Sequence, residues 1–277
     1  MKKFLRLAGS LLLVFLISFF LSGGKTPFQS DTISKKNITN NISLPSVSDA
    51  KNALPFKPAS DPKEMSMGTA LSRIRQIAFP LDVANDRLRH TNYTKIENIS
   101  DSMKKAIISV EDNRFYSHHG FDFTAIIRAT LVNIQSGEIS EGASTITQQL
   151  VKNIYLSDEQ TMARKIEELI MALNLESRCS KDEILELYLN SIYFGSGYYG
   201  ITDAARGYFG KSPDNLELPE AAMLAGLPNA PSLYSPYEDF KLAKKRQFVV
   251  LDTMVKNGYI DKSLAEDAKR APIYLAH

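Results

Sequence analysis

The segment STITQQLVKN, residues 144–153, places polar side chains at a spacing that could form a binding surface. If this segment is a helix, one face carries Thr145, Gln148, Gln149 and Lys152, at i, i+3, i+4 and i+7. The opposite face carries Ile146, Leu150 and Ile154. Thr145 and Gln148 also fit a capping box, in which both side chains bond to free backbone N–H groups. The segment alone therefore leaves open a merely solvated polar face and a binding face.

Two glutamates and three cations could perform a specific chemistry if the fold brings them together. Glu111 follows the apolar AIISV, and Glu168 lies among apolar residues in RKIEELIMA, where an ion pair with Arg164 is an equally good explanation. Sugar transfer needs a carboxylate that removes a proton from the attacking hydroxyl. A pyrophosphate leaving group needs cations, and Lys152, Arg164 and Lys165 could supply them.

The composition excludes several classes of protein. The chain has 277 residues, 44% of them hydrophobic, and a formal net charge of +2, which is typical of a globular protein. A nucleic-acid-binding protein would usually show a basic excess, so nucleic acid is not an expected partner. Cys179 is the only cysteine, which excludes a disulfide framework and a cysteine-based zinc site within the chain.

The N-terminal residues predict a membrane anchor followed by a tether. Lys2, Lys3 and Arg6 precede an apolar run that ends near Gly24, a pattern that predicts a cytoplasmic N-terminus and an exported remainder. We predict an anchor at residues 1–24, although the run is short for a span of roughly 20 residues, so a cleaved signal peptide is the alternative. Residues 25–81 are predicted to be a flexible tether, because the segment from Lys25 to about Lys63 is rich in Ser, Asn, Thr, Lys and Pro.

Residues 82–277 are predicted to form one mainly α-helical domain. Apolar residues recur at helical spacing in most segments of this region, and strand patterns are few and short. Ser180 and Glu183 form a second capping box at the start of one predicted helix. Pro219 marks the first turn of another, which Gly226 and Pro228 end.

Five segments of this domain closely resemble the five ordered motifs of the peptidoglycan glycosyltransferases. These lysozyme-like domains occur in class A penicillin-binding proteins and in monofunctional transglycosylases. The segments follow one another without large gaps and show no departure at the residues that matter. They are EDNRFYSHHG (111–120), GASTITQQLVKN (142–153), RKIEELIMALNLE (164–176), KDEILELYLNSIYFGSGYYGI (181–201) and EAAMLAGLPNAPSLYSP (220–236).

The resemblance implies a role for each candidate residue. Glu111 matches the principal catalytic glutamate, the general base on the 4-hydroxyl of N-acetylglucosamine in an incoming lipid II. Glu168 matches a second glutamate that assists at the donor side. Residues that contact the donor phosphates are matched by Lys152, Arg164 and Lys165, and residues that line the cleft by Ser144, Thr145 and Gln149. Asp112 and His118 are expected to be structural.

The resemblance also implies the reaction and its setting. Lipid II would add to a lipid-linked glycan chain with inversion, forming β-1,4 linkages and releasing undecaprenyl pyrophosphate. No cofactor is required, although a divalent cation, Mg or Mn, could sit at the donor pyrophosphate, and no protein-held metal is expected. The catalytic domain would lie outside the bacterial plasma membrane, together with other cell-wall synthesis proteins. A small jaw subdomain would rest on the bilayer, with residues 121–132 and 154–156 as candidates.

Three alternatives to this assignment stay open. A lysozyme-like lytic enzyme would share the fold and the glutamate but has little use for Lys152, Arg164 and Lys165. A non-catalytic cell-wall scaffold would not need Glu111 at all. The chain lacks the Lys-Thr-Gly element of a transpeptidase, so it is predicted to be monofunctional, but a truncated bifunctional protein would look identical.

Overall fold

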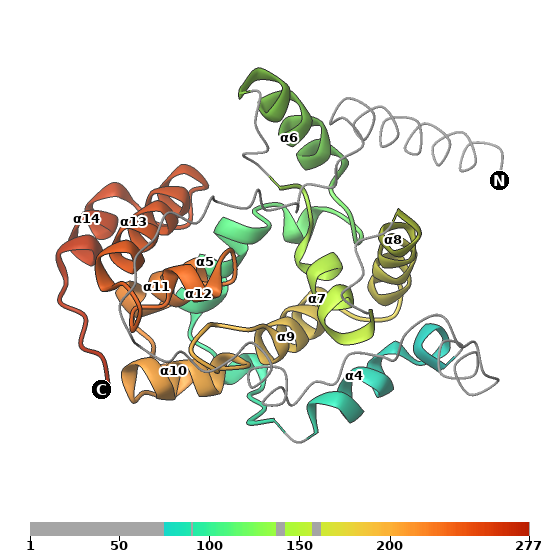
Figure 1. The fold of residues 1–277 in the computed structure, drawn as a ribbon, viewed down its shortest axis with the longest axis horizontal. Coiled ribbons are helices and arrows are strands. Elements are labelled where there is room, and N and C mark those ends of the chain that lie inside the picture. Colours follow the sequence, from blue (N-terminus) through green and yellow to red (C-terminus); the bar gives the residue numbers. More distant parts are fainter. Residues whose placement is uncertain (1–74, 90, 137–141, 157–161, 277) are drawn as a thin grey trace, which may run out of the picture. The chain divides into compact units, whose positions relative to one another are not determined.

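The computed structural model describes residues 75–89, 91–136, 142–156 and 162–276, and these form two compact units (Figure 1). The smaller unit holds helix α6 (Phe123–Ser136) together with residues 142–143. All other described residues belong to the larger unit, which contains every predicted site residue. The predicted anchor and nearly all of the predicted tether lie outside the described residues. Residue 82, the predicted start of the domain, lies inside helix α4 (Pro80–Leu88).

The larger unit is built from α-helices and short 3-10 turns, as the periodicity predicts. Within its described residues, the only extended pairing is a single bridge between Tyr193 and Tyr199. In chain order its helices are α4 (Pro80–Leu88), α5 (Asp101–Glu111), α7 (Ile146–Tyr155), α8 (Met162–Glu176), α9 (Lys181–Ser191), α10 (Ile201–Phe209), α11 (Leu218–Gly226), α12 (Pro231–Tyr234), α13 (Phe240–Lys256) and α14 (Lys262–Arg270). The 3-10 turns are η1 (Ile96–Asn98), η2 (Phe115–Ser117) and η3 (Pro213–Asn215).

Side-chain caps fix where the helices of the site begin. The Ser100 side chain accepts the N–H of Met103 at the start of α5. The capping boxes predicted at Thr145 and at Ser180 are both present, at the starts of α7 and α9. Each such cap contributes about 1 kcal/mol to the stability of its helix. The caps therefore set the register in which α5, α7 and α9 present their side chains.

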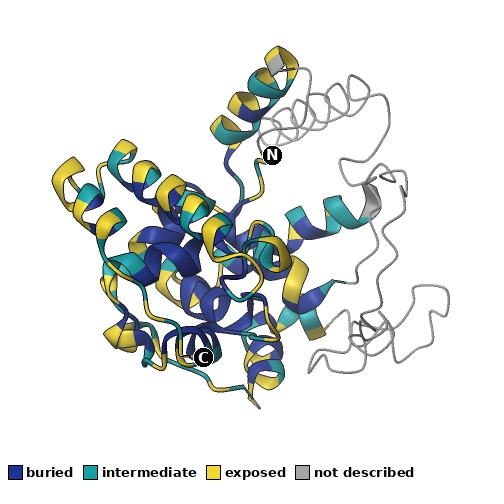
Figure 2. Cartoon of the chain, turned by 60° about the vertical axis from the view of Figure 1, so that its left-hand side comes forward, coloured by how far each residue is buried: buried dark blue, intermediate teal, exposed yellow. Residues whose placement is uncertain are grey.

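The core lies between the helices that carry the five motifs, and Figure 2 shows the buried residues gathered in the middle of the larger unit. Helix α7 packs against α8 and α9, while α5 packs against α11 and α13. The predicted apolar face of α7, Ile146, Leu150 and Ile154, is completely buried. This burial fixes the rotation of α7, and with it the direction of its polar face.

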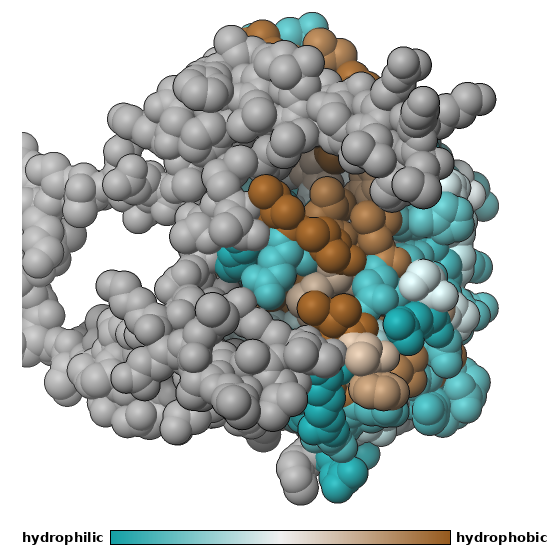
Figure 3. Space-filling model, turned by 90° about the vertical axis from the view of Figure 1, so that its right-hand side faces the viewer, coloured by the Kyte–Doolittle hydropathy of each residue, from teal (hydrophilic) through white to brown (hydrophobic). Residues whose placement is uncertain are grey.

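Helix α8 leaves two large apolar side chains exposed to solvent. Ile166 and Ile170 are 42% and 56% exposed. On the side of the molecule where α8 lies, Figure 3 shows apolar side chains gathered between polar ones. The buried positions of α8 are instead Glu168, Met171, Ala172 and Leu175, which turns the glutamate inward.

Helix α6 carries an exposed apolar stripe along one face. Its members recur at i, i+4, i+8 and i+11 and are all more than 40% exposed: Phe123, Ile127, Leu131 and Ile134. This helix covers most of the first segment proposed to rest on the bilayer. In the second segment, Ile154 and Tyr155 are buried and the Tyr155 hydroxyl donates to Pro80 O. Residues 154–155 are therefore part of the core and not of an exposed jaw surface.

Each helix in the described ranges is either too short or too polar to cross a bilayer.

Candidate active site

Glu111 is the last residue of α5, and a neutral amide holds its carboxylate. Gln149 Nε2, on α7, donates to Glu111 Oε2 at 2.8 Å. Gln149 Oε1 in turn accepts the hydroxyl of Tyr188, on α9, at 3.0 Å. Because Tyr188 is completely buried, its hydroxyl fixes which end of the Gln149 amide faces the glutamate. Three helices therefore cooperate to orient one carboxylate.

The surroundings of Glu111 pull its pKa in opposite directions. Burial disfavours the charged carboxylate and raises the pKa above its ordinary value, and this is the largest effect. The hydrogen bond from Gln149 and the positive charge of Arg246 lower the pKa, and the charge of neighbouring Asp112 raises it. A glutamate whose pKa is raised toward neutrality is well suited to accept a proton as a general base.

Asp112 joins the end of α5 to the start of α7, as expected of a structural residue. Its carboxylate accepts the backbone N–H of Ile146 at 3.1 Å and lies 2.9 Å from His118 Nε2. Both Asp112 and His118 are buried. His118 thus orders the motif, in agreement with its expected role. This clamp keeps the last turn of α5, and therefore Glu111, in a fixed place beside α7.

Thr145 lies behind the site and shapes it. Its hydroxyl accepts the N–H of Gln148 and donates to Gly120 O at 2.8 Å, and the residue is only 2% exposed. Gly120 has a φ of +87°, and a side chain there would lie 3.0 Å from the backbone of Ala172 on α8. Of the predicted stripe, Thr145 and Gln148 are buried and form the capping box, Gln149 holds Glu111, and only Lys152 is exposed.

Glu168 faces two cations and lies at the inner side of α8. Lys165 Nζ bonds to one carboxylate oxygen, and Arg164 Nη1 lies 3.4 Å from the other. Lys165 Nζ also donates to the Ser144 hydroxyl at 3.2 Å. The Glu168 side chain is 2% exposed, whereas those of Arg164 and Lys165 are 14% and 32% exposed. The ion pair that the sequence offered as a simple explanation for Glu168 is therefore present, but it belongs to a larger cluster of predicted site residues.

Lys152 stands in the last turn of α7. It is exposed and makes no hydrogen bond or ion pair with any described residue. Helix α7 and the segment leading into it thus connect the two clusters, with Gln149 beside Glu111 and Ser144 beside Lys165. The predicted residues Ser144, Gln149, Lys152, Arg164 and Lys165 all lie on α7, on α8 or next to them.

Two residues that act on Glu111, one of them through Gln149, are not distinguished in the sequence. Tyr188 lies in the segment ELYLN, where its spacing marked it only as a helix residue. Arg246 lies in the run KKR on α13, and nothing in that run distinguishes it from its neighbours. Only the packing of α9 and α13 against the site shows that these two side chains differ from other tyrosines and arginines.

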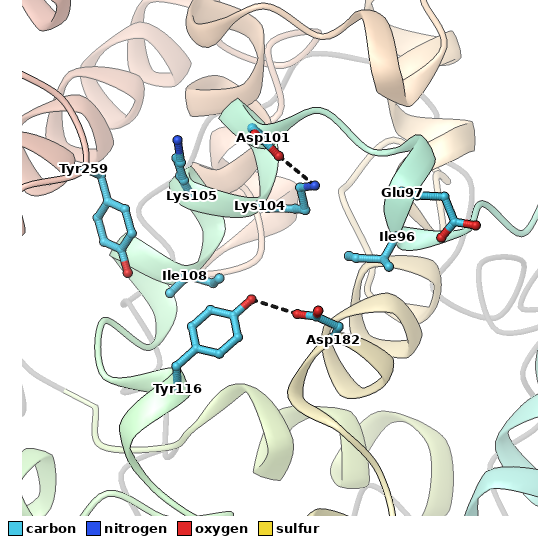
Figure 4. A pocket seen from close by; sticks show the side chains of 9 residues that line it. All are labelled: Ile96, Glu97, Asp101, Lys104, Lys105, Ile108, Tyr116, Asp182 and Tyr259. Atoms are coloured by element: carbon cyan, nitrogen blue, oxygen red, sulfur yellow. Dashed lines mark hydrogen bonds and ion pairs between the residues drawn. The ribbon is translucent and has the colours of Figure 1, made fainter.

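A surface pocket of about 490 Å³ adjoins α5, but it is separate from this site (Figure 4). None of the predicted site residues lines it. In Figure 4, Tyr116 donates to Asp182 at 3.0 Å across one side of the pocket, and Lys104 pairs with Asp101 at 2.7 Å on another. The lining is a mixture of charges of both signs, so the pocket gives no indication of one ligand class.

The comparisons with known proteins agree with the five motifs. A family model described as transglycosylase matches residues 80–255. The chain belongs to the transglycosylase family. The resemblance to the peptidoglycan glycosyltransferases is thereby confirmed, and the protein is an enzyme of glycosyl transfer.

Two relatives and one solved structure show how far the likeness extends. A Cupriavidus necator protein that carries the name transglycosylase is 45% identical over 68% of this chain and 81% of its own. Penicillin-binding protein 1A of Escherichia coli K12 is 48% identical over 64% of this chain. The crystal structure of penicillin-binding protein 1A from Haemophilus influenzae matches 47% of this chain and 16% of its own, with 34% identity and a TM-score of 0.33. The matched part spans only 21% of the Escherichia coli protein.

Proposed function

We propose that this transglycosylase polymerises lipid II into glycan strands of peptidoglycan. The incoming lipid II would supply the 4-hydroxyl of its N-acetylglucosamine, and the lipid-linked strand would supply the anomeric carbon of N-acetylmuramic acid. The new bond would be β-1,4, formed with inversion, and undecaprenyl pyrophosphate would leave. The observation that carries the proposal is the arrangement along α7, with an oriented, half-buried glutamate at one cluster and grouped cations at the other.

Glu111 would act as the general base of this transfer. Gln149 occupies Oε2, so Oε1, which has no hydrogen bond from any described residue, would accept the proton of the attacking hydroxyl. As the O–H bond breaks, the sugar oxygen would form its bond to the anomeric carbon. The bond from that carbon to the pyrophosphate oxygen would break, and its electron pair would leave with the diphosphate. Attack from the face opposite the leaving group inverts the configuration.

The cations would receive the charge that develops on the leaving group. Lys152 has no partner among the described residues, so its charge is available to a phosphate oxygen. Lys165 and Arg164 are held side by side by Glu168, which would position them and the Ser144 hydroxyl for the donor. Fixed donors aimed at a developing negative charge stabilise a transition state strongly in a site from which water is excluded. Glu168 would thus assist at the donor side, as the family resemblance implies.

The donor atoms of the site do not fit a metal held by the protein. Both oxygens of Glu168 face cations, and no three His, Cys, Asp or Glu side chains cluster in the described part of the chain. A Mg or Mn ion at the donor would be held mainly by oxygens of the substrate pyrophosphate.

We also propose that the enzyme acts at the outer face of the bacterial plasma membrane. The substrate keeps its polyprenyl chain in the bilayer, so an N-terminal anchor at residues 1–24 would hold the enzyme beside it. The exposed stripe of α6, Phe123, Ile127, Leu131 and Ile134, would serve as the membrane-facing jaw surface. Cell-wall synthesis proteins are the expected partners there.

One assay separates this function from its two rivals. Purified full-length protein is incubated with lipid II, with Glu111→Gln in parallel, and the products are resolved by glycan length. We expect polymer from the wild type and a rate lower by about 10²-fold or more in the variant, since general-base catalysis contributes about 10²–10⁴-fold. Cleavage of mature glycan without polymer would favour the lytic enzyme. Full complementation of cell growth by Glu111→Gln would favour the scaffold.

A further inference from the structure

Asn257 ends helix α13 in a rigid turn. The Gly258 N–H donates to Val255 O at 3.0 Å. The next N–H, of Tyr259, donates to Met254 O at 2.9 Å. These two bonds form a Schellman motif, in which the residue after the helix end takes the left-handed conformation. Gly258 has the positive φ that this motif requires, +74°. The turn therefore holds the backbone of Asn257 in one conformation.

The Asn257 side chain bonds to the chain on both sides of Glu111. Its Nδ2 donates to Ser109 O at 3.1 Å, two residues before the glutamate. Its Oδ1 accepts from Asn113 Nδ2 at 3.3 Å, two residues after the glutamate. One amide thus bridges the end of α5, although Asn257 lies beyond the last of the five motifs, which ends at residue 236.

The bond to Ser109 pairs a carbonyl that the end of α5 leaves free. The last four carbonyl groups of an α-helix have no N–H partner within the helix. The Asp112 N–H donates to Ile108 O, but among the described residues no backbone N–H donates to Ser109 O. Ser109 is buried, and a buried carbonyl without a partner is unfavourable. Asn257 on α13 supplies the missing donor.

The position of Glu111 depends on helices other than those that carry the cations. Helix α5 packs against α11 and α13, whereas α7 packs against α8 and α9. The 2.8 Å bond from Gln149 to Glu111 therefore joins two groups of helices. Asp112 ties the end of α5 to the start of α7, and Asn257 ties the same end to α13. These two ties, from two different helices, hold the last turn of α5 in one orientation.

We propose that Asn257 is a positioning residue, which holds the last turn of α5 so that the Glu111 carboxylate meets Gln149 in the geometry of the general base. Asn257 would make no contact with either sugar. Misplacement of a reacting group by about 1 Å can cost about 10²-fold in rate, so a small movement of this turn is sufficient. The relevance to catalysis rests on the proposed role of Glu111, but the Gln149–Glu111 bond can be observed without turnover.

The first measurement follows the Gln149–Glu111 hydrogen bond itself. Full-length protein in detergent is labelled with ¹⁵N-glutamine, and the Gln149 side-chain NH₂ resonance is assigned by its loss in Gln149→Leu. Asn257→Ala removes both bonds of the amide, and Asn257→Asp keeps the acceptor for Asn113 but loses the donor to Ser109 O. In both variants the Gln149 resonance should move toward its position in Glu111→Ala, where the acceptor is absent.

The matched control is Gln247→Leu, on the same helix. Gln247 Nε2 donates to Pro219 O, near the start of α11, at 2.6 Å. This variant therefore also removes a bond from an α13 amide to a backbone carbonyl, but that bond does not involve α5. Its Gln149 resonance should coincide with that of the wild type, even if its stability falls as much as that of the Asn257 variants.

The second measurement is the rate of polymerisation. Asn257→Ala should lower kcat about tenfold and leave KM for lipid II within about twofold, because the misplaced base affects the transition state more than substrate binding. Gln247→Leu should keep both constants. The losses of Asn257→Ala and Gln149→Leu should be less than additive in the double variant, because both disturb one hydrogen bond.

A third variant keeps the test decisive if neither Asn257 variant folds. Asn113→Ala removes only the bond between the two asparagines, so it should move the Gln149 resonance less but in the same direction. An unmoved resonance in the folded variants of Asn257 and Asn113, or kcat losses that add in the double variant, would overturn the inference. Polymerisation that survives in Glu111→Gln would instead overturn the proposed function, whatever the Asn257 variants show.

Discussion

Gln149 donates from its side-chain nitrogen to the Glu111 carboxylate over 2.8 Å, and this bond would be lost if the amide turned around, because its oxygen would then face the carboxylate. A second bond runs from the Tyr188 hydroxyl to the Gln149 oxygen. A flipped amide would present its oxygen to the carboxylate and its NH₂ group to a hydroxyl. Glu111 therefore meets a donor at one oxygen and is left with the other oxygen for chemistry.

The first prediction concerns removal of this donor. Gln149→Leu takes away a contribution that lowers the pKa of Glu111, so the acid limb of the polymerisation profile should move to higher pH. A hydrogen bond to a charged group contributes about 1.5–3 kcal/mol, and about 1.4 kcal/mol is a factor of ten. We expect kcat to fall about tenfold or more at neutral pH. The profile is measured with lipid II from pH 5 to 9.

The matched control is Asn153→Leu, which removes an exposed amide from the same helix. Its pH–rate profile should coincide with that of the wild type. If Gln149→Leu loses activity equally at every pH, Gln149 contacts the substrate as the sequence suggested and does not tune the base.

Local structure was predictable where short-range rules determine it. The capping boxes at Thr145 and Ser180 follow from side chains three residues apart. The buried face of α7 follows from periodicity. The five motifs identified the family and, through it, Glu111, Glu168 and the cations as site residues. This identification did not predict how these side chains are arranged in space.

The electrostatics of the site could not be predicted, because they depend on packing between distant segments. Arg246 follows Glu111 by 135 positions in the sequence, and its charge acts on Glu111 only because α13 packs on α5. Tyr188 matters because α9 covers α7. The exposure of Ile166 could not be predicted either, since an apolar residue at helical spacing need not face the core. The periodicity of apolar residues predicts that a helix has an apolar face, but it does not predict which other segment packs on that face.

The second prediction concerns Lys152, the exposed cation of α7. Lys152→Ala should weaken use of the donor by about tenfold or more, because a charge-assisted bond to a phosphate contributes about 1.5–3 kcal/mol. Stability should change by less than about 0.5 kcal/mol, since the side chain is exposed and has no partner among the described residues. Initial rates are measured against lipid II concentration at two salt concentrations. Lys256→Ala, an exposed lysine in the last turn of α13, is the control.

Unchanged donor kinetics in Lys152→Ala would remove this residue from the proposed site. A loss equal to that of Lys256→Ala would attribute the effect to net charge alone.

The third prediction places the stripe of α6 in the bilayer. Cys179 is the only cysteine and is buried, and burial raises the pKa of its thiol to about 12, so an introduced cysteine can be labelled selectively. A fluorophore at Ile127→Cys or Leu131→Cys should be quenched by brominated lipids when the full chain is in vesicles. A fluorophore at Lys245→Cys, on exposed α13, should be quenched far less. Equal quenching at all three positions would exclude the stripe as the bilayer contact.

The last prediction is that the ionised carboxylate of Glu111, the proposed general base, destabilises the folded state. Burial raises the pKa of Glu111 above its ordinary 4.5, so between the two values the native state binds more protons than the unfolded chain. Stability must then fall as pH rises through that interval. Glu111→Gln has no such charge, so its free energy of unfolding should exceed that of the wild type increasingly above about pH 4.5. Urea unfolding from pH 4 to 8 measures the difference, with Glu97→Gln, an exposed glutamate, as the control. A variant that is less stable than the wild type throughout would show that Gln149 and Arg246 more than offset the burial of the charge.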